Sequence, residues 1–147
     1  MRIERRTIID APPSRVWDVL ADWEGQAAWM PDVSWVRVVG ASRAEGARLE
    51  VRTKILGIPA MTDRVVETGF DAPHRLAVEH RGPVKGRGEW RLEAFGSGTR
   101  FTWIEDLRLP PGPVGELALR AYGPLQRALL ARSLRNLAAL CEERPGR

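Results

Sequence analysis

Three consecutive stretches in the second half of the chain alternate apolar and charged residues with a period of two. They cover residues 76–81, 86–94 and 101–107, and segments containing glycine, proline or serine separate them. Successive side chains of a β-strand point to opposite faces of its sheet, so this period is typical of strands with one buried and one solvent-facing side. The pattern predicts an antiparallel meander with a single apolar face.

The connections between these stretches predict how the strands pair. A two-residue turn at Ser97-Gly98 gives three opposed pairs on the apolar face: Ala94 with Phe101, Leu92 with Trp103, and Trp90 with Glu105. Between the first two stretches, a loop of three or five residues keeps the faces consistent. It predicts another set of pairs: Leu76 with Trp90, Val78 with Gly88, and His80 with Gly86. The two glycines would leave open volume on the inner face.

The rest of the chain predicts four more strands, two short helices and one long helix. We expect strands at residues 2–10, 33–40, 49–55 and 61–70. Pro12 and Pro13 end the first strand and suit the first turn of a short helix. Asp22 can cap a second short turn, which Pro31 ends.

A long helix is expected from residue 114 to about residue 143, where the sequence is rich in leucine, alanine and arginine. The pair Gly123-Pro124 should kink or split it. Helical spacing predicts a largely apolar stripe: Leu117, Leu125, Ala128, Leu129, Arg132, Leu137, Leu140 and Cys141.

This order of elements predicts an α+β fold in one domain, residues 1–147. The chain would run through one strand, two short helices and six more strands, and the seven strands would form one curved antiparallel sheet. The long C-terminal helix would then lie across the apolar face of this sheet. One helix cannot fill a strongly curved sheet, so a cavity should remain between them.

Residues 55–61 are apolar throughout but contain a glycine and a proline, so they are expected to form a turn with apolar flanks. Leu56, Gly57, Ile58 and Pro59 are predicted to gate the cavity, since a gate needs apolar side chains on a weakly paired backbone. The alternative is that these side chains plug one end of the cavity.

Composition excludes several classes of protein. The formal net charge is +4, but the 21 arginines and 2 lysines are scattered, so specific nucleic-acid binding is not indicated. The single cysteine, Cys141, excludes an internal disulfide and is expected to be buried. No cluster of histidine, cysteine and carboxylate residues has the spacing of a metal site, and the sequence contains no nucleotide-binding loop. We therefore expect no metal or cofactor. With no apolar signal region or transmembrane run, we expect a cytoplasmic monomer or homodimer.

The chain resembles the START-like (SRPBCC) superfamily, which has the helix-grip fold of the birch pollen allergen. Within it, the resemblance is to the polyketide cyclase/dehydrase and lipid-transport-like branch of small bacterial proteins. The segments on which the resemblance rests span nearly the whole chain: Ile9-Asp10-Ala11-Pro12, Val16-Trp17, Trp29-Met30-Pro31-Asp32-Val33, Pro73-His74-Arg75-Leu76, Trp90-Arg91-Leu92, Gly98-Thr99-Arg100-Phe101-Thr102 and Leu137-Ala138-Ala139-Leu140-Cys141-Glu142-Glu143. The resemblance implies a fold and a cavity rather than a catalytic motif.

The alternation and the expected cavity together predict which residues contact a ligand. The expected set is Trp29, Val51, Thr53, Leu76, Val78, His80, Trp90, Phe101, Trp103, Glu105, Tyr122, Leu125 and Leu129. Most are apolar, as in ligand pockets generally.

No catalytic residue can be assigned, and His80, Glu105 and Tyr122 are weak candidates. A carboxylate on an apolar face is costly unless paired. Either an arginine meets Glu105, or burial raises the pKa of Glu105 and the group serves a ligand. His80 is either a satisfied histidine or a hydrogen-bonding or acid–base group. Tyr122 either orients a ligand or makes an ordinary helix–sheet contact.

Three classes of function remain open. The leading hypothesis is a protein that binds a hydrophobic small molecule or lipid in the cavity. An alternative implied by the resemblance is a cyclase, aromatase or dehydrase acting on a polyketide-like substrate. A second alternative is an interaction protein associated with ribosomes or with coenzyme Q, for which the basic pI is the only support.

Overall fold

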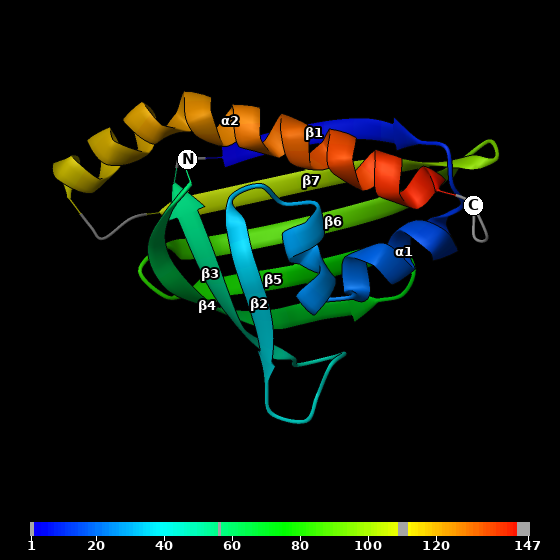
Figure 1. Ribbon diagram of the computed structural model, residues 1–147, viewed down its shortest axis with the longest axis horizontal. Coiled ribbons are helices and arrows are strands. Elements are labelled where there is room, and N and C mark those ends of the chain that lie inside the picture. Colours follow the sequence, from blue (N-terminus) through cyan, green and yellow to red (C-terminus); the bar gives the residue numbers. More distant parts are fainter. Residues whose placement is uncertain (1, 56, 109–111, 144–147) are drawn as a thin grey trace.

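The computed structural model describes residues 2–55, 57–108 and 112–143 (Figure 1). Its elements, in chain order, are β1 (Arg2–Ile9), α1 (Pro13–Ala21), η1 (Glu24–Ala28), β2 (Val33–Val39), β3 (Arg48–Ile55), β4 (Ile58–Asp71), β5 (Arg75–Arg81), β6 (Lys85–Phe95), β7 (Gly98–Arg108) and α2 (Pro113–Glu142). The seven strands form one sheet in the order β1-β7-β6-β5-β4-β3-β2, with every neighbouring pair antiparallel. This is the predicted α+β helix-grip arrangement, and the fold class is confirmed.

Helix α2 crosses one face of the curved sheet, and α1 and η1 lie on that same side beneath its C-terminal half (Figure 1). Proline at the start of α1 fits the first turn, where its missing N–H would be unpaired anyway. Val16, Trp17 and Leu20 then face inward from α1. Asp22 accepts a hydrogen bond from the backbone N–H of Gly25 at 3.3 Å, as its position before the second turn predicts.

The register between β5 and β6 is the predicted one. A three-residue loop connects the strands, and Leu76, Val78 and His80 lie opposite Trp90, Gly88 and Gly86. The one-sided alternation of both strands selects this pairing, because a shift by one residue would move the apolar side chains to solvent.

The register between β6 and β7 differs from the prediction by two residues. The turn is centred on Gly96-Ser97, so the observed pairs are Ala94 with Thr99, Leu92 with Phe101, Trp90 with Trp103 and Gly88 with Glu105. Gly96 adopts φ +59°, a left-handed conformation that glycine enters without strain, and it therefore takes the first turn position. A two-residue shift preserves the faces, so the pattern alone could not detect the error.

Helix α2 runs unbroken through Pro124, so it is not split into two helices. Among the side chains of α2 that the structure describes, the most buried are those of Leu130, Ser133, Leu134, Leu137 and Cys141. The predicted stripe is therefore correct near the C-terminus and wrong in the first half, where Leu117 is 69% exposed. Figure 1 gives the reason, since the first turns of α2 project past the ends of the strands. The burial of Cys141 is as predicted.

Candidate functional site

A cavity of about 390 Å³ lies between the inner face of the sheet and α2. Its apolar wall includes Leu49, Val51, Met61, Val65, Val78, Trp90, Trp103, Leu107, Leu129 and Leu130. The strand residues among these lie at alternating positions, so their strands present one side chain in two to the cavity. Trp23, Gln26 and Met30, from the segment containing η1, close another side of the cavity.

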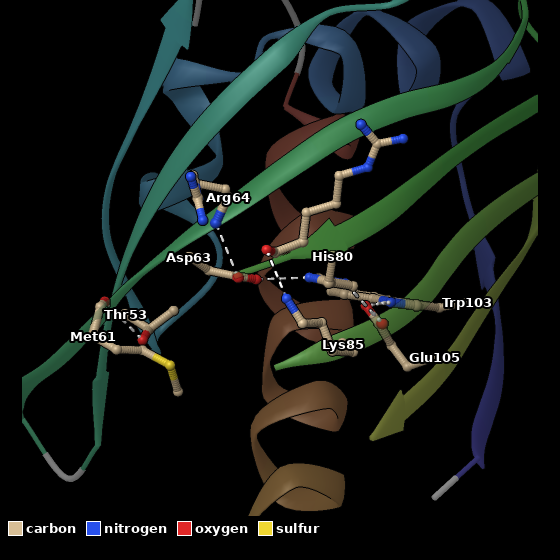
Figure 2. Close-up of polar contacts among 9 residues, drawn as sticks. Thr53, Met61, Asp63, Arg64, His80, Lys85, Trp103 and Glu105 are labelled. Atoms are coloured by element: carbon tan, nitrogen blue, oxygen red, sulfur yellow. Dashed lines mark hydrogen bonds and ion pairs between the residues drawn. The ribbon is translucent and has the colours of Figure 1, made fainter. Parts of the chain in front are cut away.

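The titratable side chains of the wall lie close enough to interact with one another. They are Asp32, Lys54, Asp63, His80, Glu105 and Tyr122. Figure 2 shows His80 between Asp63 and Glu105, with Trp103 next to Glu105. The imidazole Nδ1 lies 2.8 Å from Asp63 Oδ2, and Nε2 lies 3.4 Å from Glu105 Oε2. The indole N–H of Trp103 donates to Glu105 Oε1 at 3.0 Å.

These contacts span four adjacent strands, and the glycines of β6 make the span possible. Gly88 lies opposite both Val78 on β5 and Glu105 on β7. A Cβ atom at position 88 would lie 3.1 Å from both carboxylate oxygens of Glu105, closer than most real Cβ contacts. The missing side chain therefore gives the Glu105 carboxylate room on the inner face, where His80 can reach it.

Two carboxylates hold His80 in its charged form. Burial alone opposes the charge, but the contacts with Asp63 and Glu105 and the negative charges of these groups outweigh it and raise the pKa of His80 to about 10. At neutral pH the ring is therefore an imidazolium, with Asp63 at Nδ1 and Glu105 at Nε2. Such a group is a poor general base, and it can donate a proton only if one carboxylate contact opens.

Two further groups of the cavity have raised pKa values. Burial raises the pKa of Asp32, the charge of Glu105 raises it further, and the ammonium of Lys54 opposes the rise. Burial also raises the pKa of Tyr122, and the charge of Asp32 adds to this effect. The cavity thus has an apolar body and a polar part that is rich in carboxylates.

The structure places nine of the residues predicted to contact a ligand in the cavity wall. They are Val51, Thr53, Val78, His80, Trp90, Trp103, Glu105, Tyr122 and Leu129. The wall brings together the three weak catalytic candidates, His80, Glu105 and Tyr122, and the first two are in contact. No ligand is present, so a ligand-binding role for any of these residues stays a prediction.

Four of the predicted residues, Trp29, Leu76, Phe101 and Leu125, lie outside the wall. Trp29, 1% exposed, packs against Trp90 and Trp103 with ring centroids 5.8 Å from each. Phe101 and Leu76 are fully buried in the same core. That part of the inner face is filled by α1, η1 and the C-terminal half of α2, so the cavity is displaced toward β3 and β4 and the other end of α2. Leu125 is half-buried and does not line the cavity.

The charged partner of Glu105 is not the arginine that one of the two alternatives predicted, and the other alternative, a role in ligand binding, stays a prediction. No arginine meets this carboxylate in the described part of the chain, and the charged partner is His80 instead. The shifted register explains the difference, because it places Gly88, rather than Trp90, opposite Glu105.

Sequence reasoning missed several polar residues of the wall, chiefly Asp32, Lys54 and Asp63. The sequence does contain a weak signal for Asp63. Alternate residues of β4 face the inside of the sheet, and Asp63 lies between Met61 and Val65 in this alternation. The alternation of inward- and outward-facing residues could not predict that Lys54 lines the cavity, because a β-bulge between Thr53 and Lys54 interrupts it in β3. Trp23 also belongs to the wall, and its indole N–H donates to the Arg43 carbonyl at 2.9 Å.

The predicted gate coincides with the β3–β4 hairpin, whose second strand begins at Ile58, earlier than expected. Ile58 is 69% exposed, and Gly57 takes φ +81°, a conformation suited to glycine. Leu56 and the side chain of Pro59 lie outside the described residues, so gating stays a prediction.

Two classes of feature are missing from the described ranges 2–55, 57–108 and 112–143. No group of three or more histidine, cysteine, aspartate or glutamate side chains is arranged to hold a metal ion there. No helix in these ranges is long and apolar enough to cross a membrane.

Comparison with solved structures identifies proteins of the same fold. The Zhui aromatase/cyclase from a Streptomyces species has a TM-score of 0.83 and 17% sequence identity, covering 97% of this chain and 93% of its own. TTHA0849 from Thermus thermophilus has a TM-score of 0.79 and 21% identity, covering 96% and 97%. Ara h 8.0201 has a TM-score of 0.65 and 14% identity, covering 94% and 98%.

Comparison by sequence is informative at the level of the family. No curated protein matches the chain. A family model described as polyketide cyclase / dehydrase and lipid transport matches residues 1–142, nearly the full length. Together with the cavity and the helix-grip fold, this match shows that the chain belongs to the polyketide cyclase/dehydrase and lipid transport family.

Proposed function

We propose that this protein binds an apolar small molecule or lipid in the cavity between the sheet and α2. The observation that carries the proposal is the cavity itself. Its volume of about 390 Å³ falls within the range of about 300–1,000 Å³ typical of ligand pockets. Its wall is largely apolar and includes a few convergent polar groups, which is the usual composition of a small-molecule site.

Native mass spectrometry of protein purified from its own host tests this proposal. We expect an additional mass that is lost on extraction with organic solvent. Binding of an apolar fluorescent probe to the extracted protein should then be competed by the extract. If no mass is retained and the probe does not bind, the proposal fails.

Catalysis is the second candidate, favoured by the contact between His80 and Glu105 in the cavity. A charged imidazole and a carboxylate at one site could assist a cyclisation or dehydration by moving a proton. The likeness of the fold to an aromatase/cyclase is compatible with this, but at 17% identity it supports only the fold. Turnover of a polyketide-like substrate, lost in both His80→Gln and Glu105→Gln while binding persists, would favour an enzyme.

A further inference from the structure

We propose that the cavity selects ligands whose polar group donates hydrogen bonds, a hydroxyl or an ammonium, and excludes carboxylates. This inference rests on the proposed binding function and assigns it a ligand chemistry. It follows from the charges that face the cavity and from the partners those charges already have.

The cavity wall is poor in available positive charge. The chain has 21 arginines, yet none belongs to the part of the wall that the structure describes. Its cations are His80 and Lys54, and its acidic groups are Asp32, Asp63 and Glu105. A site for a carboxylate usually presents a free guanidinium or ammonium, because an unpaired charge is costly among apolar side chains.

Both wall cations have acidic neighbours. The Nδ1 of His80 is hydrogen-bonded to Asp63 at 2.8 Å, and Nε2 forms an ion pair with Glu105 at 3.4 Å without a hydrogen bond, so an incoming anion would meet a carboxylate at either nitrogen. The charge of Lys54 acts on Asp32 and opposes the rise in the pKa of that carboxyl. An entering carboxylate would be repelled by the acidic groups that lie next to each of these cations.

Acceptor capacity, in contrast, remains available. Among the described residues, the Glu105 side chain accepts one hydrogen bond, from Trp103, whereas an ionised carboxylate offers about four acceptor positions. Protonation of Asp32, which burial favours, would remove one negative charge but leave the Glu105 acceptor unchanged. The Tyr122 hydroxyl both donates and accepts, so it does not discriminate. A ligand hydroxyl or ammonium therefore complements this cluster.

A series of probes with one skeleton tests the proposal by isothermal titration calorimetry at pH 7. The probes are naphthalene, 2-naphthol, 2-naphthylmethylammonium and 2-naphthoate. We expect 2-naphthol and 2-naphthylmethylammonium each to bind at least about tenfold more tightly than 2-naphthoate, a difference of about 1.4 kcal/mol. Equal or tighter binding of the carboxylate overturns the proposal.

Naphthalene separates this inference from the function on which it depends. If naphthalene binds but the affinities of the three polar probes follow another order, only the proposed selectivity is wrong. If none of the four probes binds, the proposed function falls and the selectivity falls with it.

Substitution of single carboxyl groups assigns the selectivity to its source. Glu105→Gln and Asp32→Asn each remove a negative charge with little change of shape. We expect at least one of them to reduce the preference for ammonium over carboxylate at least about threefold, while naphthalene affinity changes little. Glu93→Gln, an exposed site on the outer face near the end of β6, is the matched control and should leave the ratio unchanged. A ratio unaffected in both cavity variants, each folded by circular dichroism, contradicts the proposal.

Discussion

Gly88 shows how one residue can set the chemistry of a cavity. Its position in β6 separates His80 on β5 from Glu105 on β7, and its lack of a side chain leaves space for the carboxylate. Alternation in the sequence predicted that both polar groups face inward. It did not predict that they meet, because their contact depends on the register between β6 and β7. A turn at Ser97-Gly98 and a turn at Gly96-Ser97 give different registers but leave the same side chains on the inner face.

The charge of His80 makes a testable contribution to stability. Its pKa is raised from an ordinary value near 6.5 to about 10 by Asp63 and Glu105, against the opposing effect of burial. A group with a raised folded-state pKa binds protons more tightly when folded, so its stabilisation is complete below about pH 6.5 and is lost as pH rises toward 10. We expect the stability difference between wild type and His80→Gln to shrink steadily across this window.

Urea unfolding at a series of pH values measures this difference, and subtraction cancels groups common to both proteins. His74→Gln, which removes the other histidine at an exposed position, is the matched control for the loss of an imidazole. A constant difference for His80→Gln would show that the ring is not held in its charged form.

The tryptophans divide into structural and cavity-lining residues. Trp17 packs edge-to-face on Phe70 at 5.1 Å and does not line the cavity, whereas Trp90 does. Truncation of a buried aromatic residue costs about 3–5 kcal/mol. We expect Trp17→Ala to lose stability of this order with little change in ligand affinity once folded, and Trp90→Ala to weaken ligand binding more. An unchanged melting temperature for Trp17→Ala would contradict its place in the core.

Among the elements, strand alternation predicted more of the structure than helix periodicity did. Strands β5, β6 and β7 and their buried faces follow from a period of two. The apolar stripe of α2 was predicted less well. Helical periodicity shows which face of a helix is apolar, but not how much of the helix lies over the sheet. Exposed Leu117 lies in the part of α2 that extends past the sheet. A bulge in β3 likewise concealed Lys54, since it breaks the parity that the prediction relies on.

The β3–β4 hairpin is the element predicted to open for ligand entry. Ile58 near its tip is exposed, and Met61 a few residues later lines the cavity. A gate should open locally at a lower free energy than global unfolding. We expect amides at 57–61 to exchange faster than those at 90–94, and to slow when an apolar ligand binds.

Hydrogen exchange followed by mass spectrometry or NMR can measure this effect. The β6–β7 hairpin at 95–98 is the control, because none of its residues belongs to the cavity wall and a ligand should leave its exchange unchanged. Protection at 57–61 equal to that at 90–94, with no further slowing by ligand, would exclude a gate there.

On the scale of the whole molecule, the cavity follows from the layering of the sheet and α2, but its position does not. The sequence predicted a cavity because one helix cannot fill a curved sheet. It did not predict that Trp29, Leu76 and Phe101 would pack solidly where α1 and η1 lie, leaving space nearer to β3 and β4. That division depends on how large side chains from distant segments fit together, which no local pattern contains.

Filling the cavity should separate ligand binding from folding. Val78 lines the cavity beside Gly88, so Val78→Phe would place a ring in the space that a ligand needs. A ligand at 100 times its dissociation constant stabilises a protein by about 2.7 kcal/mol, provided that it binds only the folded state. Such a ligand should raise the melting temperature of the wild type but have little effect on Val78→Phe. Val66→Phe is the matched control, because Val66 lies on β4 at the opposite parity and outside the wall, and it should keep the full ligand-induced rise. If Val78→Phe, folded by circular dichroism, retains that rise, the ligand binds elsewhere on the molecule.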